Sequence, residues 1–314
     1  MEFDPATINL LSPSFYAGDP YPAYAWLRDR APVFYDAPRE VWGISRYDDV
    51  IAIEKNPRRY SSAQGSRPRI PGDPSMINRD DPHHNRMRRL VSERFTPRAV
   101  KRHEGEVRAR VTELIDRIAA KGRAEVVEDL AAPLPAMVIN DCLGFPLDAW
   151  PRSKHWAEVT MLAGGQHDER TGEMDFFGVE GATAAFEDFT RAVLELIPQR
   201  RRAPQDDLLS VWVHADIDGR KLRDDEVVSE ALLVLNGGAE TTRAVIGATV
   251  LHLAAFPDER AKLVGHPERM PVAVEEFIRY VTPILNMKRT VVEAHELHGQ
   301  RLEEGAELLL MYAS

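Results

Sequence analysis

The sequence feature that most constrains the fold is a long apolar helix pattern that is interrupted near its middle. Its flanking segments, 227–235 and 244–251, are apolar on nearly every side, which is typical of a helix in a protein core. Two glycines there cost about 1 kcal/mol each relative to alanine, and a carboxylate and hydroxyls add a desolvation cost. Residues so unfavourable for a buried helix usually mark a functional site. Here the glycines suggest a site where a ligand lies against bare backbone. The interrupting residues are Asn236, Gly237, Gly238, Ala239, Glu240, Thr241 and Thr242.

Composition and charge narrow the class of protein. The 314 residues are 44% hydrophobic and 29% charged, which suits a soluble globular protein. A formal charge of -10 disfavours nucleic-acid binding as the main activity. The sequence shows no apolar run of bilayer length and no signal peptide, and a single cysteine excludes intrachain disulfides. A cytoplasmic location is therefore expected.

The remaining pattern predicts a mainly α protein with small β-sheets, organised as one domain over residues 1–314. Residues 33–35 and 41–44 predict a β-hairpin, and short strands are expected within 289–314. Residues 58–80 are rich in Ser, Arg, Pro and Gly, and irregular segments of this length are usually functional or disordered. Helices are predicted over 21–30, from Asp48 or Asp49 to 56, and over 82–94, 97–121, 133–143, 147–163, 175–200, 206–214, 224–256, 258–265 and 268–281.

The central motif resembles the oxygen-activation motif of the cytochrome P-450 enzymes, the haem-thiolate monooxygenases. That motif is a small residue, Gly, any residue, Asp or Glu, then Thr. The resemblance implies the cytochrome P-450 fold, a haem b cofactor lying against Gly237 and Gly238, proton relay by Glu240, and a hydrogen bond from Thr241 to dioxygen. Without the resemblance, the same residues could also form a helix crossing with a polar contact.

A second motif, Asp81-Pro82-His83-His84-Asn85-Arg86-Met87-Arg88, resembles the start of the family's haem-flanking helix. His84 and Arg88 are four residues apart and so project from one face of a helix. The resemblance implies that they bind the haem propionates, with Arg289 as a further propionate ligand. Charge-assisted donors suit two partly buried carboxylates. A solvated basic face is the alternative.

Glu276 and Arg279 fit the family's Glu-x-x-Arg helix, which follows the central motif at the expected distance. Acid–base pairs at this spacing are common on exposed helices, so the order of the motifs carries the argument. The pair lies off the apolar stripe of its helix. In the family a further layer of protein covers this face, and we expect that layer to be missing here.

The sequence departs from the family at the axial ligand. A haem-thiolate enzyme needs a cysteine thiolate on iron, which the family places in a Gly-rich loop beyond the strands at 289–314. Cys142, the only cysteine, lies in a helical, apolar setting and reads as a core residue. We therefore expect a C-terminally truncated monooxygenase that lacks the haem-ligand loop and last helix, contains no metal ligand, and is inactive alone.

Apolar residues near these motifs suggest a mostly apolar substrate pocket. Several segments resemble the actinobacterial branch that hydroxylates steroid or cholesterol-type side chains at C27, among them Leu130–Pro135 and Met76–Pro82. Terpenoids and fatty acids are the alternatives. The expected pocket residues are Ile70, Met76, Ile77, Val234, Ile284 and Leu285.

The sequence contains no flavin or nicotinamide motif, so the resemblance implies electron supply by ferredoxin and ferredoxin reductase. The basic residues Arg86, Arg89 and Arg94 could steer an acidic ferredoxin or simply aid solubility. Two other classes are considered. One is a non-catalytic helical relic that binds an apolar ligand. The other is a His–carboxylate metalloenzyme, which the spacing of the ten histidines disfavours.

Overall fold

The computed structural model describes residues 3–163 and 179–314, so residues 175–178 of the helix predicted over 175–200 lie outside the described part. The described residues divide into two compact bodies. The β-body comprises those within Met1–Arg88, Leu162–Ala182 and Ile284–Ser314, and the helical body comprises Arg89–Met161 and Thr183–Pro283. The single domain predicted over 1–314 stays a prediction.

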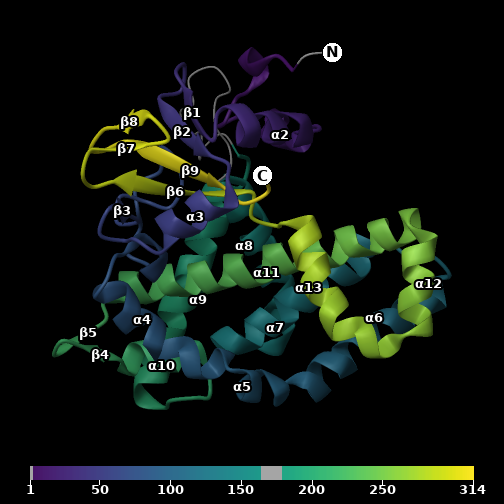
Figure 1. Ribbon diagram of the computed structural model, residues 1–314. Coiled ribbons are helices and arrows are strands. Elements are labelled where there is room, and N and C mark those ends of the chain that lie inside the picture. Colours follow the sequence, from purple (N-terminus) through teal and green to yellow (C-terminus); the bar gives the residue numbers. More distant parts are fainter. Residues whose placement is uncertain (1–2, 164–178) are drawn as a thin grey trace. The chain divides into compact units, whose positions relative to one another are not determined.

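A five-stranded sheet organises the β-body. Its order is β1-β2-β9-β6-β3, so strands from the two ends of the sequence lie side by side (Figure 1). β2 pairs with β9 in parallel and the other neighbours are antiparallel. Alternate residues of β9 pack against helices on opposite faces, with Leu309 beside α2 and Leu310 beside α3.

The elements of the β-body bear out the predicted hairpin and C-terminal strands. They are η1 (Pro5–Thr7), α1 (Pro13–Ala17), α2 (Tyr21–Arg30), β1 (Val33–Asp36), β2 (Val41–Ile44), α3 (Tyr47–Glu54), β3 (Tyr60–Ser61), η2 (Met76–Asn78), β6 (Asn286–Val291), β7 (His295–Leu297), β8 (Gln300–Leu302) and β9 (Glu307–Met311). α4 (His83–Ser92) begins in this body.

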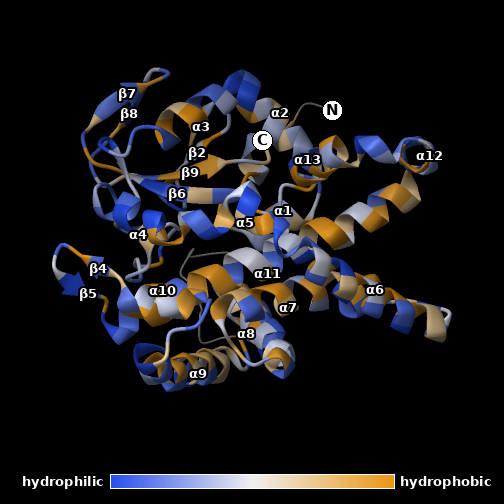
Figure 2. Ribbon diagram, turned by 90° about the horizontal axis from the view of Figure 1, so that it is seen from below, coloured by the Kyte–Doolittle hydropathy of each residue, from blue (hydrophilic) through white to orange (hydrophobic). Residues whose placement is uncertain are grey.

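The helical body is built around α11, which packs on α7, α10, α12 and α13. Apolar residues gather along α7 and α9 (Figure 2), and Trp156, Phe189 and Trp212 are its largest fully buried side chains. Wholly or for the most part it contains η3 (Glu93–Phe95), α5 (Pro97–Lys101), α6 (Glu104–Lys121), η4 (Val127–Ala131), α7 (Pro133–Leu143), η5 (Leu147–Ala149), α8 (Trp150–Ala163), α9 (Ala182–Arg202), α10 (Leu208–His214), β4 (Asp216–Ile217), β5 (Arg220–Lys221), α11 (Asp224–Ala255), α12 (Pro257–Gly265), η7 (Pro267–Arg269) and α13 (Met270–Val281).

Three predictions need correction. α3 begins at Tyr47, so Asp48 and Asp49 are not caps but first-turn acids, where they favour the helix dipole. The helix predicted over 97–121 is two helices that break between Lys101 and Glu104. The apolar segment 244–251 is not buried, because the residues packed on α11 cover its N-terminal half more fully.

No helix in the described part of the chain combines the length and apolarity that a membrane span requires.

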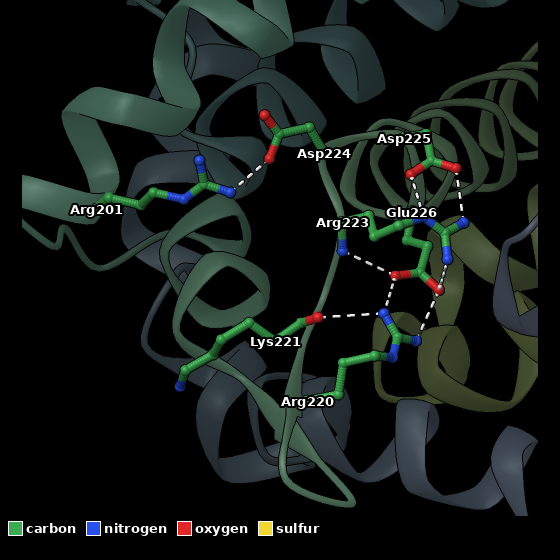
Figure 3. A network of polar contacts seen from close by, with 7 residues as sticks. All are labelled: Arg201, Arg220, Lys221, Arg223, Asp224, Asp225 and Glu226. Carbon is green, nitrogen blue, oxygen red and sulfur yellow. Dashed lines mark hydrogen bonds and ion pairs between the residues drawn. The ribbon is translucent and has the colours of Figure 1, made fainter.

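A network of charged side chains fixes the start of α11 (Figure 3). The Glu226 carboxylate accepts hydrogen bonds from Arg220 at 2.6 and 2.9 Å and from the backbone N–H of Arg223 at 2.8 Å. The hydrogen bond from Arg223 satisfies a backbone N–H at the helix start. The negative charge of Glu226 there also interacts favourably with the helix dipole. The hydrogen bonds from Arg220 lower the pKa of Glu226 below its ordinary value.

We expect Glu226→Gln to lower the free energy of unfolding by about 1 kcal/mol, because it removes a charge-assisted fork whose arginine partner is half exposed. A lowered folded pKa means that the stabilisation is fully present above the unfolded pKa of about 4.3 and is lost as pH falls through the folded pKa. Urea unfolding at pH 7 and at successively lower pH checks this. Asp225→Asn, which removes an exposed partner of Arg223, is the control and should have a smaller effect.

Candidate active site

The central motif forms one continuous α-helix, and its two glycines face different surroundings. A Cβ added to Gly237 would meet nothing within 4 Å. A Cβ added to Gly238 would lie 2.2 Å from Cδ1 and 2.6 Å from Cγ1 of Ile139, so the side chain of α7 already fills that space. The prediction that both glycines face a cofactor is therefore corrected. Gly238 allows close packing of α7 on α11, and only Gly237 leaves an uncovered backbone.

Thr241 lies one turn after Gly237 on the same side of α11. Its Oγ1 donates a hydrogen bond to the Gly237 carbonyl oxygen at 2.6 Å, a common arrangement for a threonine within a helix. This bond uses the only proton of the hydroxyl. Towards any other group, the Thr241 oxygen can therefore only accept a hydrogen bond. Rotation about the C–O bond would turn the proton away from Gly237, and the hydroxyl could then donate to a ligand.

Glu240 precedes Thr241 and is mostly buried, with 13% of its side chain exposed. Burial raises its pKa above the ordinary value, Arg243 opposes this with an ion pair of 2.7 Å between NH2 and Oε2, and Glu158 adds to the rise. A carboxyl group whose pKa is raised towards neutrality is suited to accept and release protons.

His84 and Arg88 belong to the β-body and differ in their contacts. His84 is half-buried, and its Nδ1 lies 3.0 Å from the Met76 carbonyl oxygen, so Nδ1 carries the proton. Its Nε2 could donate to a carboxylate only if the ring were doubly protonated. Arg88 is exposed and forms no ion pair within the described residues.

Arg289, on β6 in the same body, is already paired. Its NH2 donates to Glu54 Oε1 of α3 at 3.0 Å, and its NH1 donates to the Lys288 carbonyl oxygen at 2.8 Å. The Tyr312 hydroxyl donates to the same Glu54 oxygen at 2.5 Å. A propionate at Arg289 would have to share the guanidinium with Glu54, and its binding role stays a prediction.

The sequence of the chain is similar to known enzymes over nearly its whole length. Over 310 residues the chain is 38% identical to a steroid C26-monooxygenase of Mycobacterium tuberculosis, covering 98% of this chain and 76% of the relative. It is 30% identical over 296 residues to cytochrome P450 109 of Bacillus spizizenii, covering 94% and 71%. The chain belongs to the cytochrome P-450 superfamily.

The fold agrees with this membership. CYP109E1 of Bacillus megaterium, solved in complex with testosterone, matches this P-450 chain with a TM-score of 0.83 at 30% identity, covering 94% of this chain and 76% of the solved one. No family model matches the chain. The predicted mainly helical P-450 fold with small sheets is confirmed.

In this P-450 chain the Glu-x-x-Arg pair on α13 is exposed. Arg279 donates from Nε and NH2 to the two carboxylate oxygens of Glu276, both at 2.7 Å, while 68% and 55% of the two side chains are exposed. The whole of α13 has no buried residue. The pair therefore faces solvent, and the covering layer expected from the family resemblance stays a prediction.

The six residues expected in the substrate pocket are all half-buried, and none belongs to the buried core. Val234 lies in the helical body and the other five lie in the β-body. Single apolar side chains that stay partly exposed are common on any protein surface, so the role of these residues in substrate binding stays a prediction. The six are Ile70, Met76, Ile77, Val234, Ile284 and Leu285.

Cys142 is half-buried on α7 and lines a groove of about 980 Å³ with residues of α5 and α6, which corrects its interpretation as a core residue. Burial, with Asp141 beside it, raises the pKa of the thiol. A raised pKa opposes the thiolate form that binds iron. Among the described residues, no group of three or more His, Cys, Asp or Glu side chains could hold a metal ion.

The sequence interpretation missed the partners of Glu240. Arg243 also donates from NH1 to Glu158 Oε1 of α8 at 3.0 Å, so a charged contact joins α11 to α8. The spacing of Glu240 and Arg243 by three residues was a readable signal. Glu158 lies 85 residues before Arg243, so no local spacing in the sequence indicated its contribution.

Proposed function

We propose that this P-450 catalyses the O2-dependent hydroxylation of an apolar substrate, the terminal carbon of a steroid or cholesterol-type side chain. The observation that carries the proposal is the Glu240–Thr241 pair beside the uncovered backbone of Gly237. The steroid C26-monooxygenase relative supports the substrate class and favours C26 over the C27 position that the sequence suggested.

Each body contains residues whose chemistry suits haem b. In the helical body, Gly237 leaves backbone uncovered, and a flat ring could lie against it. In the β-body, His84 and Arg88 would bind carboxylates such as the haem propionates, and Arg289 would share its charge with Glu54. When bound, haem supplies the oxygen-activating redox chemistry. Glu240 would take up protons from solvent and release them towards the bound ligands, and the Thr241 hydroxyl would rotate away from the Gly237 carbonyl to donate a hydrogen bond there.

Cys142 does not fit the axial position, because burial disfavours its thiolate. We therefore expect the 314-residue polypeptide to form no thiolate-ligated haem and to be inactive alone. The ferrous–carbonyl spectrum of the purified polypeptide reconstituted with haem should lack the red-shifted thiolate band. A full thiolate band that disappears in Cys142→Ser would show that Cys142 is the ligand and contradict this expectation.

Ferredoxin and its reductase are the proposed electron donors, because no flavin or nicotinamide motif was found. Arg89 on α4 is exposed and could contact an acidic partner. Arg94 contributes less to such a surface, because it already forms an ion pair of 2.7 Å with Asp206.

A ligand titration tests the substrate class. The enzyme, supplied with the haem-ligand segment of a relative so that it binds haem through a thiolate, is titrated with sterols, terpenes and fatty acids while the haem spectrum is followed. Sterols should bind most tightly and give terminally hydroxylated products. Tighter binding and turnover of a terpene or fatty acid would show that the proposed substrate class is wrong. A spectral shift on binding without any product would favour the alternative of a non-catalytic protein that binds an apolar ligand.

A further inference from the structure

Arg243 lies between two carboxylates that come from different helices. Its NH2 is 2.7 Å from Oε2 of Glu240, one turn earlier on α11, and its NH1 donates to Oε1 of Glu158 on α8 at 3.0 Å. A guanidinium can serve two carboxylates at once because its nitrogens point in different directions. Because Glu240 and Glu158 share the charge of Arg243, each carboxylate weakens the attraction of Arg243 for the other.

The charged contacts continue from Glu158 towards solvent. Lys154 Nζ lies 3.5 Å from Glu158 Oε2 and 2.9 Å from Glu128 Oε2 of η4. The exposed fraction of the side chain is 13% at Glu240, 20% at Lys154 and 55% at Glu128. Acids and bases therefore alternate in a series that leads from the buried carboxylate to the surface.

A separate contact fixes α8 against α11 near this series. Thr160 Oγ1 lies 3.1 Å from Asn236 Oδ1, one turn before Glu240, and shares its single proton between this oxygen and the Trp156 carbonyl oxygen at 2.6 Å. The charged hydrogen bond from Arg243 to Glu158 is therefore the stronger of these two polar contacts between α8 and α11.

We propose that Arg243 is a positioning residue for Glu240, and that Glu158 on α8 controls how tightly Arg243 holds it. The proposal rests on the proposed function for its role in turnover, since Glu240 must leave Arg243 when it carries a proton. Glu158 draws the guanidinium away from Glu240 and so eases that release.

The charges acting on Glu240 give opposite expectations for two variants. They are Arg243 on its own helix and Glu158 and Lys154 on α8. Removing the positive charge of Arg243 destabilises the Glu240 carboxylate and raises its pKa. Removing the negative charge of Glu158 ends a repulsion and frees Arg243 to bind Glu240 alone, so the pKa of Glu240 falls.

The experiment is a pH titration of the 314-residue chain labelled with ¹³C in the glutamate carboxyl groups and followed by NMR. The Glu240 resonance is assigned from its absence in Glu240→Gln. Its midpoint should move up in Arg243→Gln and down in Glu158→Gln. In the double variant, Glu158→Gln should shift it less than in the parent chain, because the effect passes largely through Arg243.

Lys262→Gln is the matched control, because it removes the base of another i, i+3 pair, with Glu259 on α12, and should leave the Glu240 midpoint unchanged. Arg243→Lys should restore only part of the shift, since an ammonium lacks the fork that serves two carboxylates. Circular dichroism verifies that each variant is folded. If Arg243→Gln unfolds the chain, the Glu240 midpoint in Glu158→Gln still tests the proposal, because Glu158 is the more exposed of the two residues.

Shifts of the same sign in both single variants, or no shift in Glu158→Gln, would overturn the proposal. The titration uses no haem and no turnover. A failure of the proposed hydroxylation would therefore leave its result intact, and an unexpected titration would leave the hydroxylation standing.

Discussion

Gly238→Val should lower the free energy of unfolding by about 2–3 kcal/mol, because the added side chain overfills a packed contact. A Cβ at this position would already lie 2.2 Å from Ile139 Cδ1 and 2.6 Å from Cγ1. Ile139 is buried, with 7% of its surface exposed, so a shift of its side chain would disturb the packing of α7 on α11. Urea unfolding of the purified chain, followed by circular dichroism, measures the loss.

Gly237→Ala is the matched control for Gly238→Val. Nothing lies within 4 Å of a Cβ at Gly237, and alanine is the better helix former. This variant should therefore raise the free energy of unfolding by about 0.5–1 kcal/mol. Ile139→Ala should offset part of the damage in a Gly238→Val background, because it removes the colliding atoms. A Gly238→Val variant as stable as the parent would show that α7 does not close that face.

The two glycines show how far the sequence could specify this site. Their placement in an apolar helix indicated a functional interruption, and the helix forms over Asp224–Ala255 as expected. Their different roles depend on Ile139, 99 residues earlier, and only tertiary packing brings that side chain to Gly238. A local pattern predicts which residues share a helix turn but not which distant side chain covers them.

Helix boundaries were predictable where the sequence contains unambiguous stop signals. α7 matches its predicted range because Pro133 starts it and Gly144, in the left-handed conformation, ends it. The break between α5 and α6 has no proline or glycine at residues 102 and 103, so the pattern predicted one helix. Asp48 and Asp49 misled the prediction of α3 because acids are favoured both as caps and in the first turn.

Thr241→Ala should uncouple electron consumption from product formation in the thiolate-ligated enzyme. We expect NAD(P)H oxidation through ferredoxin and its reductase to continue, peroxide to be released, and hydroxylated product per NAD(P)H to fall about tenfold or more. The reason is that a positioned proton donor at a reacting atom is worth about 10²–10⁴-fold. Peroxide and product are quantified against NAD(P)H consumed.

The controls for Thr241→Ala separate the hydroxyl from the general effect of a small side chain. Thr241→Ser keeps an oxygen that can bond the Gly237 carbonyl and rotate towards the ligand, so coupling should be largely retained. Thr242→Ala removes the neighbouring, exposed hydroxyl and should leave coupling unchanged. Glu240→Gln should instead slow turnover, because it removes the group that takes up protons from solvent. Fully coupled turnover by Thr241→Ala would remove Thr241 from the proton path and leave Glu240 to deliver protons by another route.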